Sequence, residues 1–106
     1  MPSDEWEELL DSEENTYRPA SLAAEGFIHC STEEQLLESA SLYFADHRYL
    51  AVLEIPPKRV KDILKWEYAE SRGTDFPHLY GPLALKHVEN TFMLLKLPGK
   101  EWEVVK

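Results

Sequence analysis

The chain has 106 residues, which suits a single domain spanning residues 1–106, because a second core would have too little surface to bury. Its net charge of −9 repels phosphate backbones, so we expect no nucleic-acid partner. No apolar run approaches the roughly 20 residues that a membrane helix needs, and we expect no membrane association. The one cysteine, Cys30, cannot form an internal disulfide, which favours a reducing compartment and a cytoplasmic protein.

The first half of the chain is predicted to be mainly helical. Ser3 is expected to cap a short helix, since apolar residues recur behind it at helical spacing. After a loop, Gly26 is expected to end one helical turn over residues 21–25 as a left-handed residue. Residues 27–30 then form a short strand. Two capping-box spacings followed by one apolar stripe predict the main helix over residues 32–45.

The second half is predicted to be richer in strands. Residues 49–55 are apolar nearly throughout, which is typical of a central strand covered on both faces. The patterns further along predict a short helix at 60–64, a strand from 64, a loop at 71–75, a helical turn at 85–88, a strand at 91–97 and an edge strand at 102–105. Because helices and strands do not alternate strictly, we expect an α+β fold with a small mixed sheet, one main helix and short helical turns.

A first histidine motif occupies the strand at residues 27–30 and the serine after it. Neighbouring side chains of a strand point to opposite faces, so Phe27, His29 and Ser31 share one face. Ile28 and Cys30 share the other. A catalytic Cys30–His29 pair is therefore excluded, and we expect Cys30 to pack in the core as a small hydrophobic residue.

His29 and Ser31 together are candidates for binding an anion. Ser31 is expected at a helix start, where free backbone N–H groups attract negative charge, and His29 could donate to the anion or move a proton. The alternative is structural: His29 would be a buried histidine bonded to a carbonyl group, and Ser31 would only cap the helix.

The second motif, at residues 76–83, reads Phe-Pro-His-Leu-Tyr-Gly-Pro-Leu. Its two prolines stiffen a segment in which His78 and Tyr80 share one face. Such a preorganised polar pair suits a binding or catalytic site, although a rigid turn that only fills the core would use the same residues. We expect His29 and His78 to line one cleft, because each is followed two residues later by a hydroxyl residue.

A metal centre is the alternative interpretation of these residues. His29, His78 and Glu67 would supply two imidazoles and a carboxylate, but their spacing matches no metal-binding motif, so we expect no metal. The cations expected in loops, and thus available to a phosphate group, are Arg18, Arg48 and Arg72.

With both motifs in view, the chain closely resembles a family of small bacterial and fungal proteins, the domain-of-unknown-function family 952. The resemblance runs from Trp6 to Leu83 and rests on the two histidine motifs and on Trp66-Glu67. It brings no established activity. The family is itself similar to the ADP-ribosyltransferase-like fold, which includes NAD-using enzymes that remove a 2′-phosphate from RNA.

That relation implies a half-barrel in which residues 27–31 face NAD, the candidate cofactor, and Glu67 is the candidate catalytic or ribose-binding acid. It also implies a first strand before Trp6, which is absent or much shortened here. The residues that we expect at the site fall into two groups. The catalytic candidates are His29, His78, Tyr80 and Glu67, and the ligand-binding candidates are Phe27, Ser31, Arg18, Arg72 and Gly81.

Two functions compete. The first is an NAD- or nucleotide-handling enzyme of the ADP-ribosyl or phosphoryl transfer type, with a small-molecule substrate. The second is a non-catalytic module that binds a small ligand in the same pocket. Behind them stands an interaction domain in which both motifs serve only the fold.

Overall fold

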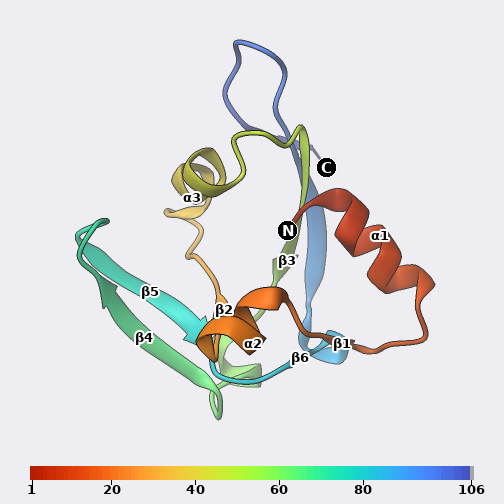
Figure 1. Cartoon of the computed structure of the whole chain (residues 1–106), viewed down its shortest axis with the longest axis vertical. Helices are drawn as coiled ribbons and strands as arrows, with labels where there is room; N and C mark the ends of the chain where they lie inside the picture. The colour runs from red at the N-terminus through yellow and green to blue at the C-terminus, as the bar shows by residue number, and fades with distance from the viewer. Residues whose placement is uncertain (106) are drawn as a thin grey trace.

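The computed structural model describes residues 1–105 and shows an α+β fold (Figure 1). The helical elements are α1 (Ser3–Asp11), α2 (Ala20–Glu25), α3 (Leu36–Tyr43) and the two 3-10 turns η1 (Pro57–Arg59) and η2 (Leu85–His87). The strands are β1 (Thr16–Tyr17), β2 (Ile28–His29), β3 (Tyr49–Glu54), β4 (Leu64–Ala69), β5 (Thr74–Leu79), β6 (Leu83–Ala84), β7 (Asn90–Leu95) and β8 (Glu103–Val105).

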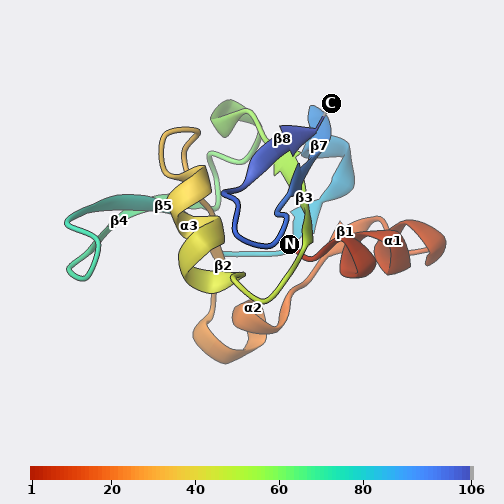
Figure 2. The ribbon, with the colours of Figure 1, turned by 90° about the horizontal axis from the view of Figure 1, so that it is seen from above.

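The strands pair into three small sheets rather than the one mixed sheet that we expected. Two of them are three-stranded, in the orders β2-β5-β4 and β3-β7-β8, and β1 pairs with β6 in a third. Every strand pair among the described residues is antiparallel. The hairpin of β4 and β5 projects from one side of the molecule and α1 from the other (Figure 2). Because all pairs are antiparallel, the fold needs none of the long crossovers that join parallel strands.

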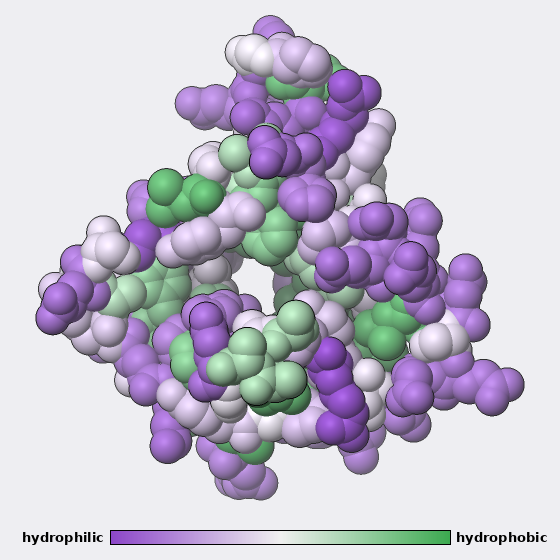
Figure 3. All heavy atoms as spheres, in the orientation of Figure 1, coloured by the Kyte–Doolittle hydropathy of each residue, from purple (hydrophilic) through white to green (hydrophobic). Residues whose placement is uncertain are grey.

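Two clusters of buried apolar side chains hold the sheets. One joins Ile28 and Leu79 of the β2-β5-β4 sheet to Val60 and Leu83. The other packs α3 against the β3-β7-β8 sheet through Ala40, Leu50, Leu94 and Trp102. The surface is hollowed between β2 and β3, with apolar patches at the rim of the opening (Figure 3). Each three-stranded sheet therefore has its own cluster, and Leu53 of β3 also packs against the first one.

The helix predicted over residues 32–45 is shorter than expected. A reciprocal pair of bonds closes a separate turn first: the Thr32 N–H donates to Gln35 Oε1 at 2.9 Å, and the Gln35 N–H donates to Thr32 Oγ1 at 3.3 Å. Helix α3 begins only at Leu36, and α1, with 9 residues, is longer than α3, with 8. The Thr32/Gln35 capping-box spacing thus predicts these hydrogen bonds correctly, but the turn that they close precedes the helix instead of starting it.

Three other predictions also need correction. Pro2 takes the position before α1, so Ser3 is the first helical residue rather than its cap. The helical turn expected at 60–64 lies earlier, as η1, because a proline at residue 57 presets the helical φ angle. Strand β3 lies at one end of its sheet instead of the middle, beside β7. The N-terminal residues cover its other edge, where the Ala51 N–H donates to the Met1 carbonyl at 2.8 Å.

Strands β1, β5 and β6 were not predicted, and β5 begins inside the loop expected at 71–75, whereas several other elements agree with the sequence-based predictions. Gly26 ends α2 with a φ of 87°, a left-handed conformation that glycine adopts without steric cost. The predicted strands at 64 and at 91–97 and the edge strand near 102–105 appear as β4, β7 and β8. In residues 1–105 no helix is long and apolar enough to cross a membrane. The ADP-ribosyltransferase-like half-barrel stays a prediction.

We predict that replacing Leu94 by alanine lowers the free energy of unfolding by about 2–5 kcal/mol, because the side chain is fully buried, with 0% exposed, and its removal leaves a cavity. Urea unfolding followed by circular dichroism measures this. Leu97→Ala is the matched control: this residue is 47% exposed, so the change should stay within about 0.5 kcal/mol. Equal losses in both variants would contradict the assignment of Leu94 to the core.

Candidate functional site

The polar face of the β2-β5-β4 sheet brings the two histidine motifs together. His29 of β2 pairs with His78 of β5, and His78 pairs in turn with Lys65 of β4. Directly paired residues of antiparallel strands point to the same face, so these three side chains form one row across the sheet. The imidazole centroids of His29 and His78 lie 5.2 Å apart. Both histidines therefore lie on one face of the sheet, and the cleft that we expect them to line stays a prediction.

Phe27 lies against both imidazoles. Its ring stacks on that of His78, with centroids 4.3 Å apart and planes inclined by 22°, and meets the ring of His29 edge-on at 4.7 Å. The ring of Tyr80 is 5.2 Å away. Four predicted site residues therefore form one aromatic cluster. Phe27 restricts the orientation of the His78 ring, since stacking holds the two planes nearly parallel.

Glu67 joins His78 and Tyr80. One carboxylate oxygen, Oε1, is 2.8 Å from His78 Nδ1 and accepts the Tyr80 hydroxyl at 2.5 Å. The hydrogen bonds from Tyr80 and His78 hold the pKa of Glu67 below its usual 4.5. The same bond to the carboxylate raises the pKa of Tyr80 above 10. Glu67 is therefore an anion at neutral pH, and it fixes Nδ1 of His78 while leaving Nε2 outside this bond.

His29 has a carboxylate partner of its own, which the sequence analysis missed. Its Nε2 pairs with Oε2 of Glu25, the last residue of α2. The left-handed Gly26 between them turns the chain so that the end of the helix faces β2. The side chain of His29 is 56% exposed and that of His78 only 14%. Each imidazole thus belongs to a separate histidine–carboxylate pair, one open to solvent and one largely enclosed.

Lys65 is a second residue that the sequence analysis missed. Its Nζ lies 4.7 Å from the centroid of the Tyr80 ring, a cation–π distance. The alternation of β4 places Lys65 and Glu67 on the same face, and this pattern was visible in the sequence. What the sequence did not show was the register that sets Lys65 beside His78. The site gains a permanent cation as a result.

Ser31 and Arg72 form their hydrogen bonds with side chains of α3, and their role as ligand contacts stays a prediction. The Ser31 hydroxyl donates to Ser39 Oγ at 2.9 Å, and Arg72 donates to the same oxygen at 3.3 Å. Because α3 begins at Leu36, Ser31 does not stand at a helix start, and the anion site expected there is not formed. Arg72 also bonds to Glu38 at 2.9 Å and has a side chain only 6% exposed. These residues tie α3 to the β4–β5 hairpin.

Gly81 and Arg18 complete the predicted set. Gly81 packs against the side chain of Ile63, where an added Cβ would come within 3.3 Å. Arg18 is exposed in the segment between β1 and α2, as is Arg48 before β3. Their placement as ligand contacts stays a prediction. Among the residues that the structure describes, no group of three or more His, Cys, Asp or Glu side chains is arranged to hold a metal ion.

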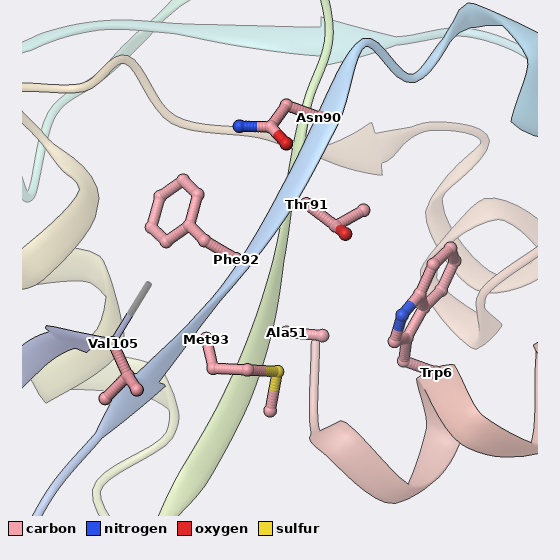
Figure 4. Close-up of a pocket in the computed structure, with 7 residues that line it drawn as sticks. All are labelled: Trp6, Ala51, Asn90, Thr91, Phe92, Met93 and Val105. Atoms are coloured by element: carbon pink, nitrogen blue, oxygen red, sulfur yellow. The ribbon is translucent and has the colours of Figure 1, made fainter.

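A cavity of about 370 Å³ lies elsewhere, between α1 and the β3-β7-β8 sheet (Figure 4). Its lining includes Trp6 on one side and Met93 and Thr91 on the other. None of its lining residues is ionisable at neutral pH, so acid–base chemistry has no group to use there. The histidine face is chemically the better candidate.

Cys30 is half-buried and lies on the apolar side of β2, packed against the cluster that contains Ile28 and Leu79. Burial raises the pKa of its thiol to about 11. The Cys30 N–H donates to the carbonyl of Pro77 at 3.1 Å. This bond keeps β2 paired with β5 although Pro77 has no N–H to donate. Cys30 therefore belongs to the fold, as the strand alternation predicted.

We predict slow alkylation of Cys30 in the native protein. With a pKa of about 11, roughly one thiol in a thousand is ionised at pH 8. Iodoacetamide should therefore react about 100-fold or more slowly with the folded protein than with the protein in urea, as followed by mass spectrometry. Equal rates in the two states would contradict the buried placement.

We also predict that Glu67→Gln lowers the pKa of Tyr80 toward 10. The carboxylate favours the protonated phenol in the folded protein, so removal of its charge makes ionisation easier. The ¹³Cζ chemical shift of Tyr80, recorded by NMR against pH, gives the value directly. Tyr17 is the internal control, because its pKa of about 12 arises mainly from burial and should not move.

Comparisons with known proteins agree with the early resemblance. No curated protein matches the chain. The crystal structure of protein CC0527 from Caulobacter crescentus is similar, with a TM-score of 0.79 and 28% identity over 97% of this chain and 89% of that one. The crystal structure of a double mutant of CC0527 matches equally well. The family described as "Protein of unknown function (DUF952)" matches residues 1–91. The chain therefore belongs to the DUF952 family.

Proposed function

We propose that the polar face of the β2-β5-β4 sheet is the active site of a nucleotide-handling enzyme, of the ADP-ribosyl or phosphoryl transfer type. The observation that carries this proposal is the pair of imidazoles, with centroids 5.2 Å apart, each held by its own carboxylate. General acid–base catalysis needs one group that accepts a proton and one that donates it within reach of the same substrate. His29 and His78 meet that requirement.

The surroundings of the two rings support catalysis more than a purely structural role. A histidine that only serves the fold is usually buried and bonded to a backbone carbonyl, whereas His29 is more than half exposed and bonded to a carboxylate. Glu67 bonds to His78 at 2.8 Å, and the Tyr80 hydroxyl donates to the same carboxylate oxygen at 2.5 Å. A carboxylate that orients an imidazole and stabilises its protonated form is a recurring device in acid–base enzymes.

The expected substrate is a nucleotide, with NAD as the alternative that the family resemblance suggests. Lys65 supplies a positive charge for a phosphate group, and the rings of Phe27 and Tyr80 supply aromatic surface beside it. We place the enzyme in the cytoplasm, because such substrates are found there and its single cysteine suits a reducing compartment.

A thermal-shift assay with NAD, ADP-ribose, AMP and cyclic AMP tests this function. A ligand that binds only the folded state at 100 times its Kd adds about 2.7 kcal/mol of stability, so the melting temperature should rise. His29→Ala and His78→Ala should lose the shift, whereas His47→Ala, in an exposed loop, should keep it. No shift with any of these nucleotides would contradict the proposal. A shift without product formation would indicate the non-catalytic binding module.

A further inference from the structure

The hydrogen bonds that the carboxylates on this face already form indicate which centre of the substrate reacts. Transfer of ADP-ribose passes through a positively charged sugar, which a free carboxylate near the ribose stabilises. Glu67 is committed to His78 and Tyr80, and Glu25 to His29. What the face offers instead are proton-carrying imidazoles and the ammonium of Lys65. These groups suit the negative charge that develops on phosphate oxygens.

The charges of the side chains on this face favour one class of phosphate group over another. With one imidazole protonated and the other neutral, as a base–acid pair requires, the two carboxylates are matched by one imidazolium and Lys65, so the face carries no net charge and accommodates one negative charge more easily than two. A phosphodiester carries one negative charge and a terminal phosphate close to two. The monoanion is therefore the better electrostatic match. The net charge of −9 disfavours a long nucleic acid, which leaves a small diester.

We propose that the enzyme hydrolyses a cyclic nucleotide, a phosphodiester closed on its own ribose, with His29 and His78 as the base–acid pair. This inference rests on the proposed function and names its substrate class. His29 is the base because it is the ring open to water. His78 is the acid because Glu67, bonded to its Nδ1, stabilises the protonated ring while Nε2 remains to give up its proton.

Hydrolysis needs only the cyclic nucleotide and one water molecule. The oxygen of a water molecule attacks phosphorus and passes a proton to neutral His29. The bond between phosphorus and one ribose oxygen breaks, and protonated His78 gives its proton to that oxygen. The product is a nucleoside monophosphate with a free hydroxyl group. Proton exchange with solvent then restores neutral His29 and protonated His78.

Hydrolysis of 2′,3′-cyclic AMP and 3′,5′-cyclic AMP by the full chain, followed by ³¹P NMR, tests the proposal. One of the two should be converted to the monophosphate, and the choice identifies the substrate. In H₂¹⁸O the label should appear on phosphorus, because the P–O bond is the one that breaks. His29→Ala and His78→Ala should each lower kcat/KM by about 100-fold or more. Lys65→Ala should mainly raise KM, and His47→Ala should change neither parameter.

These experiments distinguish a wrong substrate class from a wrong proposed function. If neither cyclic nucleotide is hydrolysed but another nucleotide, such as NAD, is bound and converted to product, the substrate class is wrong and the proposed function stands. If a nucleotide raises the melting temperature and none is converted, both the inference and the enzymatic function are wrong, and the binding module remains. If no nucleotide binds and none reacts, both fail. Because His29 lies on the surface, His29→Gln should fold normally, and its circular dichroism spectrum verifies this. Full activity in that folded variant would overturn the role of His29 as base.

Discussion

The pairing of β2 with β5 is the constraint on which the rest of the site depends. Ile28 pairs with Leu79 on the buried side of the sheet, and His29 pairs with His78 on the open side. A slip of β2 by one residue would turn His29 inward and Ile28 outward while β5 kept its place beside β4. Because Ile28 and Leu79 are 5% and 2% exposed, burial strongly favours the observed register. The apolar pair thus determines the geometry of the polar one.

The second support comes from the end of β5, where the chain leaves the sheet. The Tyr80 N–H donates to the carbonyl of Ile63 at 2.7 Å, and Gly81 packs closely on the same residue. Only a residue without a Cβ allows this approach without moving Ile63. The tyrosine ring is therefore fixed by its backbone at one end and by its bond to Glu67 at the other. Such double support is what holds a catalytic group to a narrow range of positions.

Much of the site was predictable because strand alternation is a local property. The face shared by Phe27 and His29, and that shared by His78 and Tyr80, followed from the sequence alone. Local reasoning failed where a turn broke the pattern, as at Ser31, or where separate segments meet. Glu25 reaches His29 only through the left-handed turn at Gly26, and Lys65 reaches the site only through the register of β4 with β5. The sequence shows Glu25 and Lys65, but it does not show that they lie beside the two histidines.

The two faces of the β2-β5-β4 sheet have different physical tasks, and this separation favours a functional interpretation of the histidines. The apolar face carries Ile28 and Leu79, whose burial stabilises the fold. On the polar face, His29 and Glu25 are 56% and 50% exposed, and such exposed ion pairs contribute little to stability. The weak contribution of this pair to the fold favours a role in binding, as proposed for this face. In the proposed enzyme, the net charge of −9 disfavours large polyanions, while Lys65 supplies a local positive charge for a small anion.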